Sequence, residues 1–331
     1  MNFAEVEKIA AAILYEGYIL YPYRPTAIKN RQRWNFGTLY PRMYAEAQHP
    51  QEPSRLVAEC LVEASADTPT LDVRIRFLQL IRQRNDSSTP VAAVTQSLTD
   101  PSLGWEEAVE RNWEQEALRL SDLVGRPLTR SLDMDGSGLP GDHEGQSAQN
   151  LEAVLTVGVE LLQNGARKIH LELQNASPLP SGANAKRDEA LAQSFVSAHV
   201  LLGISGDQFI SLLDPGPIYR DSAAACSNVG VFPVLAGEEP DRSMMLCSPI
   251  ILYDYPKIAP ESAGDFFDGT EMDEMLTLRV LTLTDEEKRE MRNGDPRARR
   301  ILERTEALSN ESLMKAHGAI RGMREIREDA P

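Results

Sequence analysis

The sequence LEAVLTVGVELLQNGARKIHLELQNAS, residues 151–177, has two runs of alternating apolar and polar residues on either side of Asn164-Gly165. Successive side chains of a β-strand point to opposite faces, so this period of two predicts two strands with one apolar face each. Asn-Gly favours a type I′ turn, in which both central residues have positive φ. We therefore expect an antiparallel hairpin that turns at Asn164-Gly165. Its predicted buried face comprises Leu151, Ala153, Leu155, Val157, Val159 and Leu161, answered by Ile169, Leu171 and Leu173.

Further strands are predicted on both sides of this hairpin. Upstream, residues 55–64 and 70–81 alternate in the same way, and the polar turn 65–69 between them predicts that they pair with each other. Downstream, strands are predicted at 195–204 and 209–214, which would form a second hairpin, and at 229–237 and 245–255.

Helices are predicted near both ends of the chain and once between the strands. Residues 2–16 have apolar side chains at helical spacing, which indicates an amphipathic helix that ends near Gly17. A helix is predicted over 104–124 because Trp105, Val109, Trp113 and Leu120 would lie on one helical face. After Pro260, helices are predicted at 273–283, 284–292, 296–308 and 312–323, with a capping box at Thr284 and Glu287 and a first-turn proline at Pro296.

The order of these elements predicts an α+β protein with a mostly antiparallel sheet, an N-terminal helix and a helical C-terminal region. Residues 133–147 are rich in glycine and aspartate and indicate a loop. We therefore predict a boundary near residue 145. Residues 1–145 would hold the N-terminal helix, the basic-aromatic segment and the first hairpin, and residues 146–331 the antiparallel sheet and the C-terminal helices. One continuous domain is the alternative.

The composition is that of an acidic globular protein. Fifty acidic and 34 basic residues give a formal net charge of −16, which disfavours binding to a phosphate backbone, so no nucleic-acid partner is expected. Glu16 interrupts the most apolar run, which leaves none of the roughly 20 apolar residues that a bilayer span requires. The first residues lack the positive charge of a secretory signal. We expect a cytoplasmic protein with no membrane insertion.

A basic segment, residues 17–45, contains no acidic residue and combines cations with aromatic rings. Its candidate binding residues are Arg24, Lys29, Arg31, Arg33, Trp34 and Arg42. Guanidinium groups bind carboxylate or phosphate in bidentate fashion, so the segment could hold an anion or an acidic partner. In the alternative interpretation, the cations pair with the protein's own carboxylates and the rings fill its core.

An acidic segment, residues 261–274, complements it. The candidate residues are Asp265, Asp268, Glu271, Asp273 and Glu274. They could bind a hard cation such as Mg²⁺, or they could be the negative charges that stabilise the N-terminus of a helix. Because each segment lacks internal counter-ions, we predict that cations of the basic segment approach Asp265, Asp268, Glu271 or Asp273.

A calcium loop is a weaker candidate. Asp133, Asp135, Ser137 and Glu144 occupy positions 1, 3, 5 and 12 of the calcium-binding pattern. Pro140 and the strand predicted after the loop are unfavourable for an EF-hand. No cofactor is predicted beyond weak Mg²⁺ or Ca²⁺, and no zinc, because the histidines and cysteines lack ligand spacing.

The three cysteines form no CxxC motif, and their odd number argues against a disulfide framework. Cys60 is expected to be a small core residue. Cys226 and Cys247 could be nucleophiles only if the fold placed a base beside them.

Two long motifs carry a resemblance. LYEGYILYPYRPTAIKNRQRWNFGTLYPR (14–42) and CSPIILYDYPKIAPESAGDFFDGTEMDEMLTLRVLTLTDEEKREMR (247–292) resemble uncharacterised bacterial proteins encoded in uptake NiFe-hydrogenase gene clusters. The resemblance implies a hydrogenase-associated accessory or assembly protein that binds hydrogenase subunits or maturation factors, and it supplies no catalytic residues. The alternative is a metal-assisted hydrolase or transferase that acts on an anionic substrate between the basic and acidic segments. Whether the protein is an enzyme stays open, with protein binding the favoured expectation.

Overall fold

The structure is a computed structural model of the chain, and it describes residues 3–16, 22–24, 36–63, 68–82, 106–136, 149–258 and 273–308. These residues divide into two compact units. The first unit holds 3–16 and 36–257 and carries every strand described, whereas the second holds 22–24, 258 and 273–308 and is helical. Antiparallel strands preceded and followed by helices confirm the predicted α+β class.

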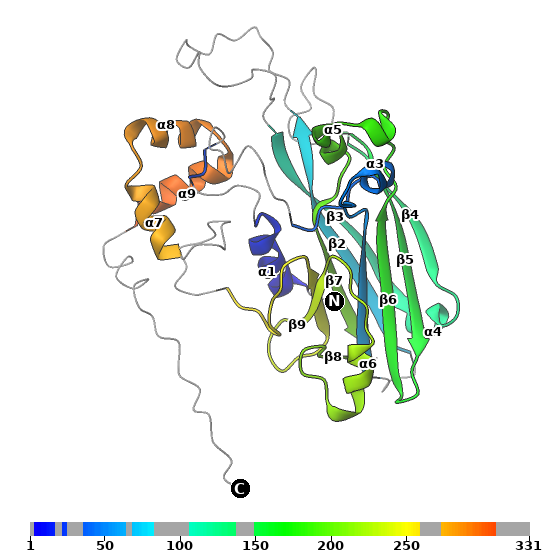
Figure 1. Cartoon of the computed structure of the whole chain (residues 1–331). Coiled ribbons are helices and arrows are strands. Elements are labelled where there is room, and N and C mark those ends of the chain that lie inside the picture. The colour runs from blue at the N-terminus through cyan, green and yellow to red at the C-terminus, as the bar shows by residue number, and fades with distance from the viewer. Residues whose placement is uncertain are drawn as a thin grey trace, which may run out of the picture. The chain divides into compact units, whose positions relative to one another are not determined.

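The first unit contains two five-stranded antiparallel sheets (Figure 1). The first sheet has the order β4-β5-β6-β1-β8, and the second has the order β3-β2-β7-β10-β9. The strands of the first sheet are β1 (Arg55–Glu63), β4 (Leu128–Met134), β5 (Leu151–Leu161), β6 (Ala166–Asn175) and β8 (Gln208–Ile210). The strands of the second are β2 (Thr70–Arg82), β3 (Glu106–Arg119), β7 (Val196–Ser205), β9 (Phe232–Ala236) and β10 (Met244–Ser248).

The two sheets share one hydrophobic core. Alternate side chains of each strand point into it, such as Leu171 from the first sheet and Ile75 from the second, and both are fully buried. Burying a side chain of this size stabilises the fold by about 1.5–3 kcal/mol. The predicted face of the 151–173 hairpin lies in this core, except that Leu161 at the end of β5 is 61% exposed.

The hairpin itself is confirmed, since β5 and β6 pair with Leu155 opposite Leu173. The predicted turn type is wrong. Gly165 has φ +82°, whereas Asn164 keeps a negative φ. The Leu162 N–H donates to Ala166 O at 2.9 Å and the Gly165 N–H to Leu162 O at 3.1 Å. This is a three-residue loop, a type I turn followed by a glycine in the left-handed region, and it requires only one positive φ.

Two predicted strand pairings are wrong, although the strands exist. β1 pairs with β6 and β8 in the first sheet, and β2 pairs with β3 and β7 in the second, so β1 and β2 form no hairpin. Likewise β7 lies in the second sheet and β8 in the first. Alternation fixes which side chains face the core but does not identify the neighbouring strand. In both cases the chain crosses from one sheet to the other.

The helix predicted over 104–124 is wrong, because this segment forms β3 and the short helix α4 (Leu120–Leu123). Residues four apart share a face in a strand as well as in a helix. Val109 and Trp113 therefore fit both patterns, and only the exposed residues that alternate with them, such as Glu110, Asn112 and Glu114, show the period of two. Ile75 of β2 pairs with Trp113.

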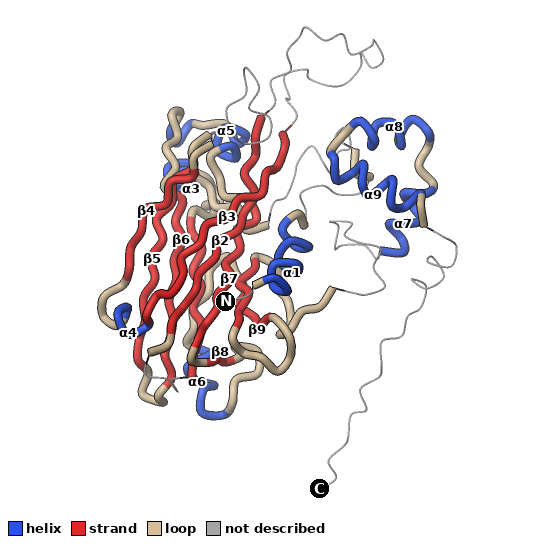
Figure 2. The backbone as a smooth tube through the Cα atoms, turned by 180° about the vertical axis from the view of Figure 1, so that it is seen from behind, coloured by secondary structure: helices blue, strands red, loops and turns tan. Residues whose placement is uncertain are grey.

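Short helices surround the sheets of the first unit. The predicted N-terminal helix is confirmed as α1 (Ala4–Leu14), and its Phe3, Val6 and Ala10 face pack on the outer side of β7 and β10. The view from behind shows α1 beside this sheet (Figure 2). Besides α1 and α4, the described part of this unit contains α3 (Arg42–Ala47), α5 (Arg187–Ala192), α6 (Arg220–Ala224) and the 3-10 turns η1 (Gly182–Asn184) and η2 (Pro217–Tyr219).

The second unit contains α7 (Asp273–Leu281), α8 (Asp285–Asn293) and α9 (Pro296–Glu306). The capping box is confirmed, since the Glu287 N–H donates to Thr284 Oγ1 at 3.3 Å and the Thr284 N–H to Glu287 Oε2 at 2.9 Å. Pro296 lies in the first turn of α9 as predicted. The helix predicted at 312–323 lies outside the described residues, and packing of these helices on the sheet stays a prediction.

The boundary predicted near residue 145 falls within 137–148, outside the described residues. Strands from both sides of it share a sheet, since β4 pairs with β5 along its whole length. Among the helices that the structure describes, none combines the length and the apolar content that crossing a membrane requires.

Candidate functional site

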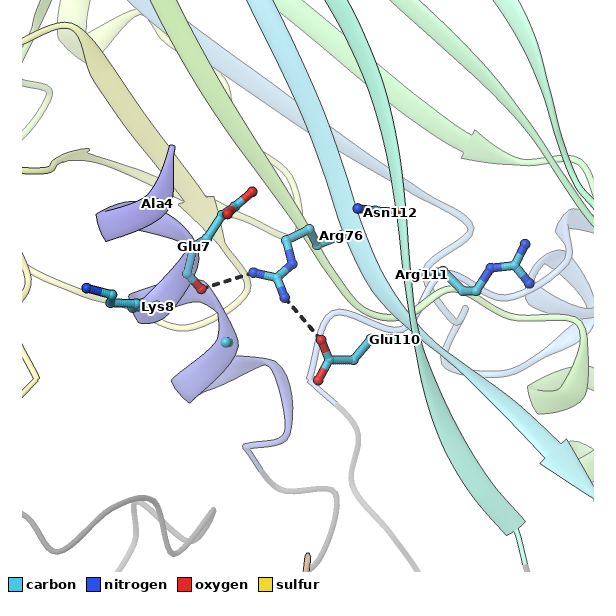
Figure 3. A pocket seen from close by; sticks show the side chains of 8 residues that line it. Ala4, Glu7, Lys8, Arg76, Glu110, Arg111 and Asn112 are labelled. Atoms are coloured by element: carbon cyan, nitrogen blue, oxygen red, sulfur yellow. Dashed lines mark hydrogen bonds and ion pairs between the residues drawn. The ribbon is translucent and has the colours of Figure 1, made fainter. Parts of the chain in front are cut away.

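A polar pocket lies on the outer face of the second sheet, beside α1 (Figure 3). Its volume is about 530 Å³. It is lined by Ala4, Glu7, Lys8 and Ala11 of α1, by Arg76 of β2, and by Glu110, Arg111 and Asn112 of β3. The pocket exists because the apolar side of α1 covers β7 and β10, which leaves its charged side facing β2 and β3.

Arg76 crosses this pocket and connects its two sides. Its Nη1 donates to Glu7 O at 3.0 Å, and its Nη2 donates to Glu110 Oε2 at 3.1 Å. The side chain is 14% exposed, so these bonds are only partly screened by water. Arg111 points to the opposite side of β3 in Figure 3 and donates to Gln79 Oε1 at 2.8 Å. Arg76 therefore links α1 to β3 across the pocket.

Arg74 makes a second set of contacts on the same face of β2. It forms an ion pair with Glu7, lies 3.4 Å from Glu114 Oε2, and places its guanidinium carbon 4.4 Å from the centre of the Phe3 ring. Cation–π contacts of this kind contribute about 0.5–2 kcal/mol. Arg74 and Arg76 of β2 thus form ion pairs with Glu114 and Glu110 of the neighbouring strand β3.

Strand β3 is the edge of the second sheet next to the pocket. It pairs with β2, and among the residues that the structure describes no strand pairs with its other side. The register is continuous from Glu106 to Gln115. Beyond it β3 has a bulge, because the three steps from Gln115 to Leu118 oppose the two steps from Val73 to Leu71, and Ala117 has φ +55°. Between Glu110 and Gln115, one side of β3 has no strand partner among the described residues, so this stretch presents backbone N–H and C=O groups.

A buried histidine lies beside Arg76, on the neighbouring strand and the same face of the sheet. His199 of β7 pairs with Arg76 in the sheet and is fully buried, and its Nδ1 lies 2.6 Å from Ser197 O. A carbonyl oxygen can only accept, so Nδ1 carries the proton, and Nε2 meets no partner among the described residues. Burial lowers the pKa of His199 to about 4. The Ser197 bond opposes this shift and the charge of Arg76 adds to it.

A second polar cluster lies on the outer face of the first sheet. Glu59 Oε1 is 3.1 Å from His170 Nδ1 and 3.9 Å from Lys168 Nζ, and Glu59 Oε2 accepts from the Ser227 N–H at 2.7 Å. Burial acts to raise the pKa of Glu59, but the bonds from Ser227 and His170 and the Lys168 charge outweigh it and hold that pKa below its usual value. The polar groups of this cluster therefore interact with one another.

Cys60 and Cys226 are not activated for nucleophilic chemistry. Cys60 is a fully buried core residue, as predicted, and contact with Cys247 and burial together raise its pKa well above the usual value. Burial and the charge of Glu59 raise the pKa of Cys226 to about 11, against the opposing charge of Lys168. The thiolate, which is the nucleophile, is therefore scarce at Cys226 near neutral pH.

The structure places two of the candidates from the basic segment. Arg24 lies in the second unit, where its Nη2 is 3.1 Å from Glu287 Oε1 and its Nη1 is 3.5 Å from Glu290 Oε2 of α8. Arg42 pairs with Glu46 at 2.6 Å within α3, and both side chains are exposed. The remaining candidates, Lys29, Arg31, Arg33 and Trp34, lie outside the described residues.

The acidic segment is described only in part. Asp273 and Glu274 open α7, and their side chains, together with Asp265, Asp268 and Glu271, lie outside the described residues. The predicted contact between basic and acidic segments therefore stays a prediction, as does the hydrolase or transferase that depends on it.

The calcium loop is likewise incomplete. Asp133 lies in β4 opposite Glu152, and Asp135 follows that strand, whereas Ser137 and Glu144 lie outside the described residues. Strands β4 and β5 flank the loop where an EF-hand has helices. Within the described ranges, no three acidic, histidine or cysteine side chains converge as a metal site would require.

The ion-paired face of β2 and β3 is absent from our sequence-based predictions. Arg74 and Arg76 alternate with buried Val73, Ile75 and Phe77, which is a readable signal of a strand with one charged face. Their partners Glu110 and Glu114 were not predicted, because the helix predicted over 104–124 placed both glutamates on a helix surface.

Compared with known proteins, the chain matches no protein-family model and no curated protein sequence.

Proposed function

We propose that this chain is an accessory protein that acts by binding another protein through the first unit. The observation that carries the proposal is the outer edge of β3, the longest strand described, which has no strand partner among the described residues and lies beside the pocket of α1. An open sheet edge is a template for strand addition, and proteins that do not use such an edge usually shorten or cover it.

The resemblance of residues 14–42 and 247–292 to proteins encoded beside uptake NiFe hydrogenases supports a narrower partner class. On this proposal the partner is a hydrogenase subunit or a maturation factor, and the complex forms in the cytoplasm. The net charge of −16 favours a basic protein surface over a nucleic acid.

Affinity purification of the tagged full chain from its native host tests the proposal. We expect a hydrogenase subunit or maturation factor to be enriched over a tag-only control by quantitative mass spectrometry. Deletion of the gene should lower uptake-hydrogenase activity, and the intact gene should restore it. Unchanged activity in the deletion strain, together with no hydrogenase protein above the control, would contradict the proposal.

A further inference from the structure

The four sheet edges of the first unit differ in how they are protected. Strand β9 is short, contains Pro233, and has Leu235 held by the Asp254 carboxylate and the Tyr255 N–H, at 2.7 Å each. Strand β8 is three residues long, and β4 has seven residues. Strand β3 has fourteen, no proline, and a regular register over Glu106–Gln115. It is the edge best suited to receive another strand.

The outer face of β3 has a defined charge. Glu110, Asn112 and Glu114 are exposed at alternate positions on this face. Arg76 and Arg74 of β2 contact the Oε2 atoms of Glu110 and Glu114, and no group among the described residues bonds to either Oε1. Because a carboxylate accepts several hydrogen bonds, each glutamate can bind a second cation from the open side of the strand.

The neighbouring pocket provides room for such a cation. Its volume of about 530 Å³ extends from α1 to Glu110 and Asn112. A strand added to β3 would lie about 4.8 Å away, with side chains of like position on the same face. A long basic side chain opposite Glu110 or Asn112 would therefore reach a carboxylate at the rim of the pocket.

A second copy of this chain fits the edge poorly. Two copies of β3 related by a twofold axis perpendicular to the sheet must place residues of equal parity opposite each other. Registers centred on Glu110, Asn112 or Glu114 set a glutamate directly against a glutamate, for example Glu110 against Glu114 when the axis passes through Asn112. Like charges directly opposite are destabilising, so the charge pattern favours a different, basic strand.

We infer that β3 receives an extended segment of the partner with lysine or arginine at alternate positions, which adds a sixth strand to the second sheet and pairs with Glu110 and Glu114. This inference rests on the proposed function and names the chemistry of the partner. Backbone hydrogen bonds supply affinity, and the alternate cations select the register and the face.

A fluorescent ten-residue peptide that alternates lysine with valine is the probe, and anisotropy with the full chain measures its binding. The test variant is Glu110→Gln with Glu114→Gln, which removes two charges and keeps the side-chain shape. The matched control is Glu160→Gln with Glu172→Gln, which removes two glutamates that pair with Lys168 and Arg55 on the first sheet.

We expect the test variant to bind the peptide at least tenfold more weakly than wild type, and the control variant to bind within threefold of it. A peptide N-methylated at alternate residues should lose binding, because it cannot complete the backbone ladder. Amide hydrogen exchange of residues 110–115 should slow when the peptide is bound.

Equal binding of the N-methylated peptide, or no added protection in β3, would overturn strand addition. Equal loss in both variants would show that the attraction is non-specific. If the hydrogenase partner is still enriched with the test variant, this docking mode fails while the proposed function stands. If wild type enriches no such partner, the proposed function fails.

Discussion

At the scale of single residues, burial decides which ionisable side chains can carry a charge in the folded protein. Arg76 and His199 are neighbours in the sheet, yet Arg76 makes two bonds from a partly exposed position, whereas His199 is fully buried. The buried ring must stay neutral, because a charge there would be desolvated and lie near a guanidinium. His199 is therefore a structural group whose protonation opposes folding.

We predict that His199 makes the protein less stable in mild acid. Its pKa is about 4 in the fold against about 6.5 in the unfolded chain, so between these values the unfolded chain holds one more proton. The free energy of unfolding should fall by roughly 1.4 kcal/mol per pH unit below pH 6.5 and level off below pH 4. Urea titrations of wild type and His199→Gln should show that wild type loses about 2 kcal/mol more between pH 6.5 and 5.

His49→Gln is the control for this experiment, because His49 is exposed and its ring stays in water. It should show the wild-type dependence on pH. Parallel curves for wild type and His199→Gln would contradict the assignment.

At the scale of elements, the loop that joins β5 and β6 depends on one glycine, Gly165. Gly165 is the residue with positive φ, and a Cβ added there would meet no atom within 4 Å. Any cost of substitution must then come from the backbone conformation rather than from a clash. The Asn164 side chain supports the same loop by accepting from the Ala166 N–H at 3.2 Å.

We predict that Gly165→Ala lowers the free energy of unfolding by about 1–2 kcal/mol, since L-residues resist the left-handed region. Gly165→Asn should cost less than Gly165→Ala, because asparagine tolerates this conformation better. Chemical denaturation of the two variants measures the order. An alanine variant as stable as wild type would show that the loop adopts another turn.

At the scale of the whole first unit, stability comes from the core that both sheets share. Leu171 is fully buried there, whereas Leu161, on the paired strand of the same hairpin, is 61% exposed. A leucine-to-alanine change should therefore lower the free energy of unfolding more at Leu171 than at Leu161, because only Leu171 is buried.

We predict that Leu171→Ala lowers the free energy of unfolding by about 2–5 kcal/mol, because it removes buried methyl groups and leaves a cavity between the sheets. The matched change Leu161→Ala should cost less than about 0.5 kcal/mol. Guanidinium denaturation provides both values. Similar losses at the two positions would mean that the sheets do not enclose Leu171 as described.

The sequence by itself determined the local structure wherever a pattern had one solution. Alternation identified β5 and β6, the capping box identified α8, and Pro296 marked the start of α9, because each signal depends on residues close in the chain. Only the tertiary structure decided which strands are neighbours. The same alternation allows β1 to pair with β2 or with β6, and a spacing of four allows 104–124 to be a helix or a strand. In both cases, packing against the opposite sheet selects one of the two structures. The face where Arg74 and Arg76 meet Glu110 and Glu114 arises from pairing across 34–40 residues of sequence, so no local pattern could assemble it.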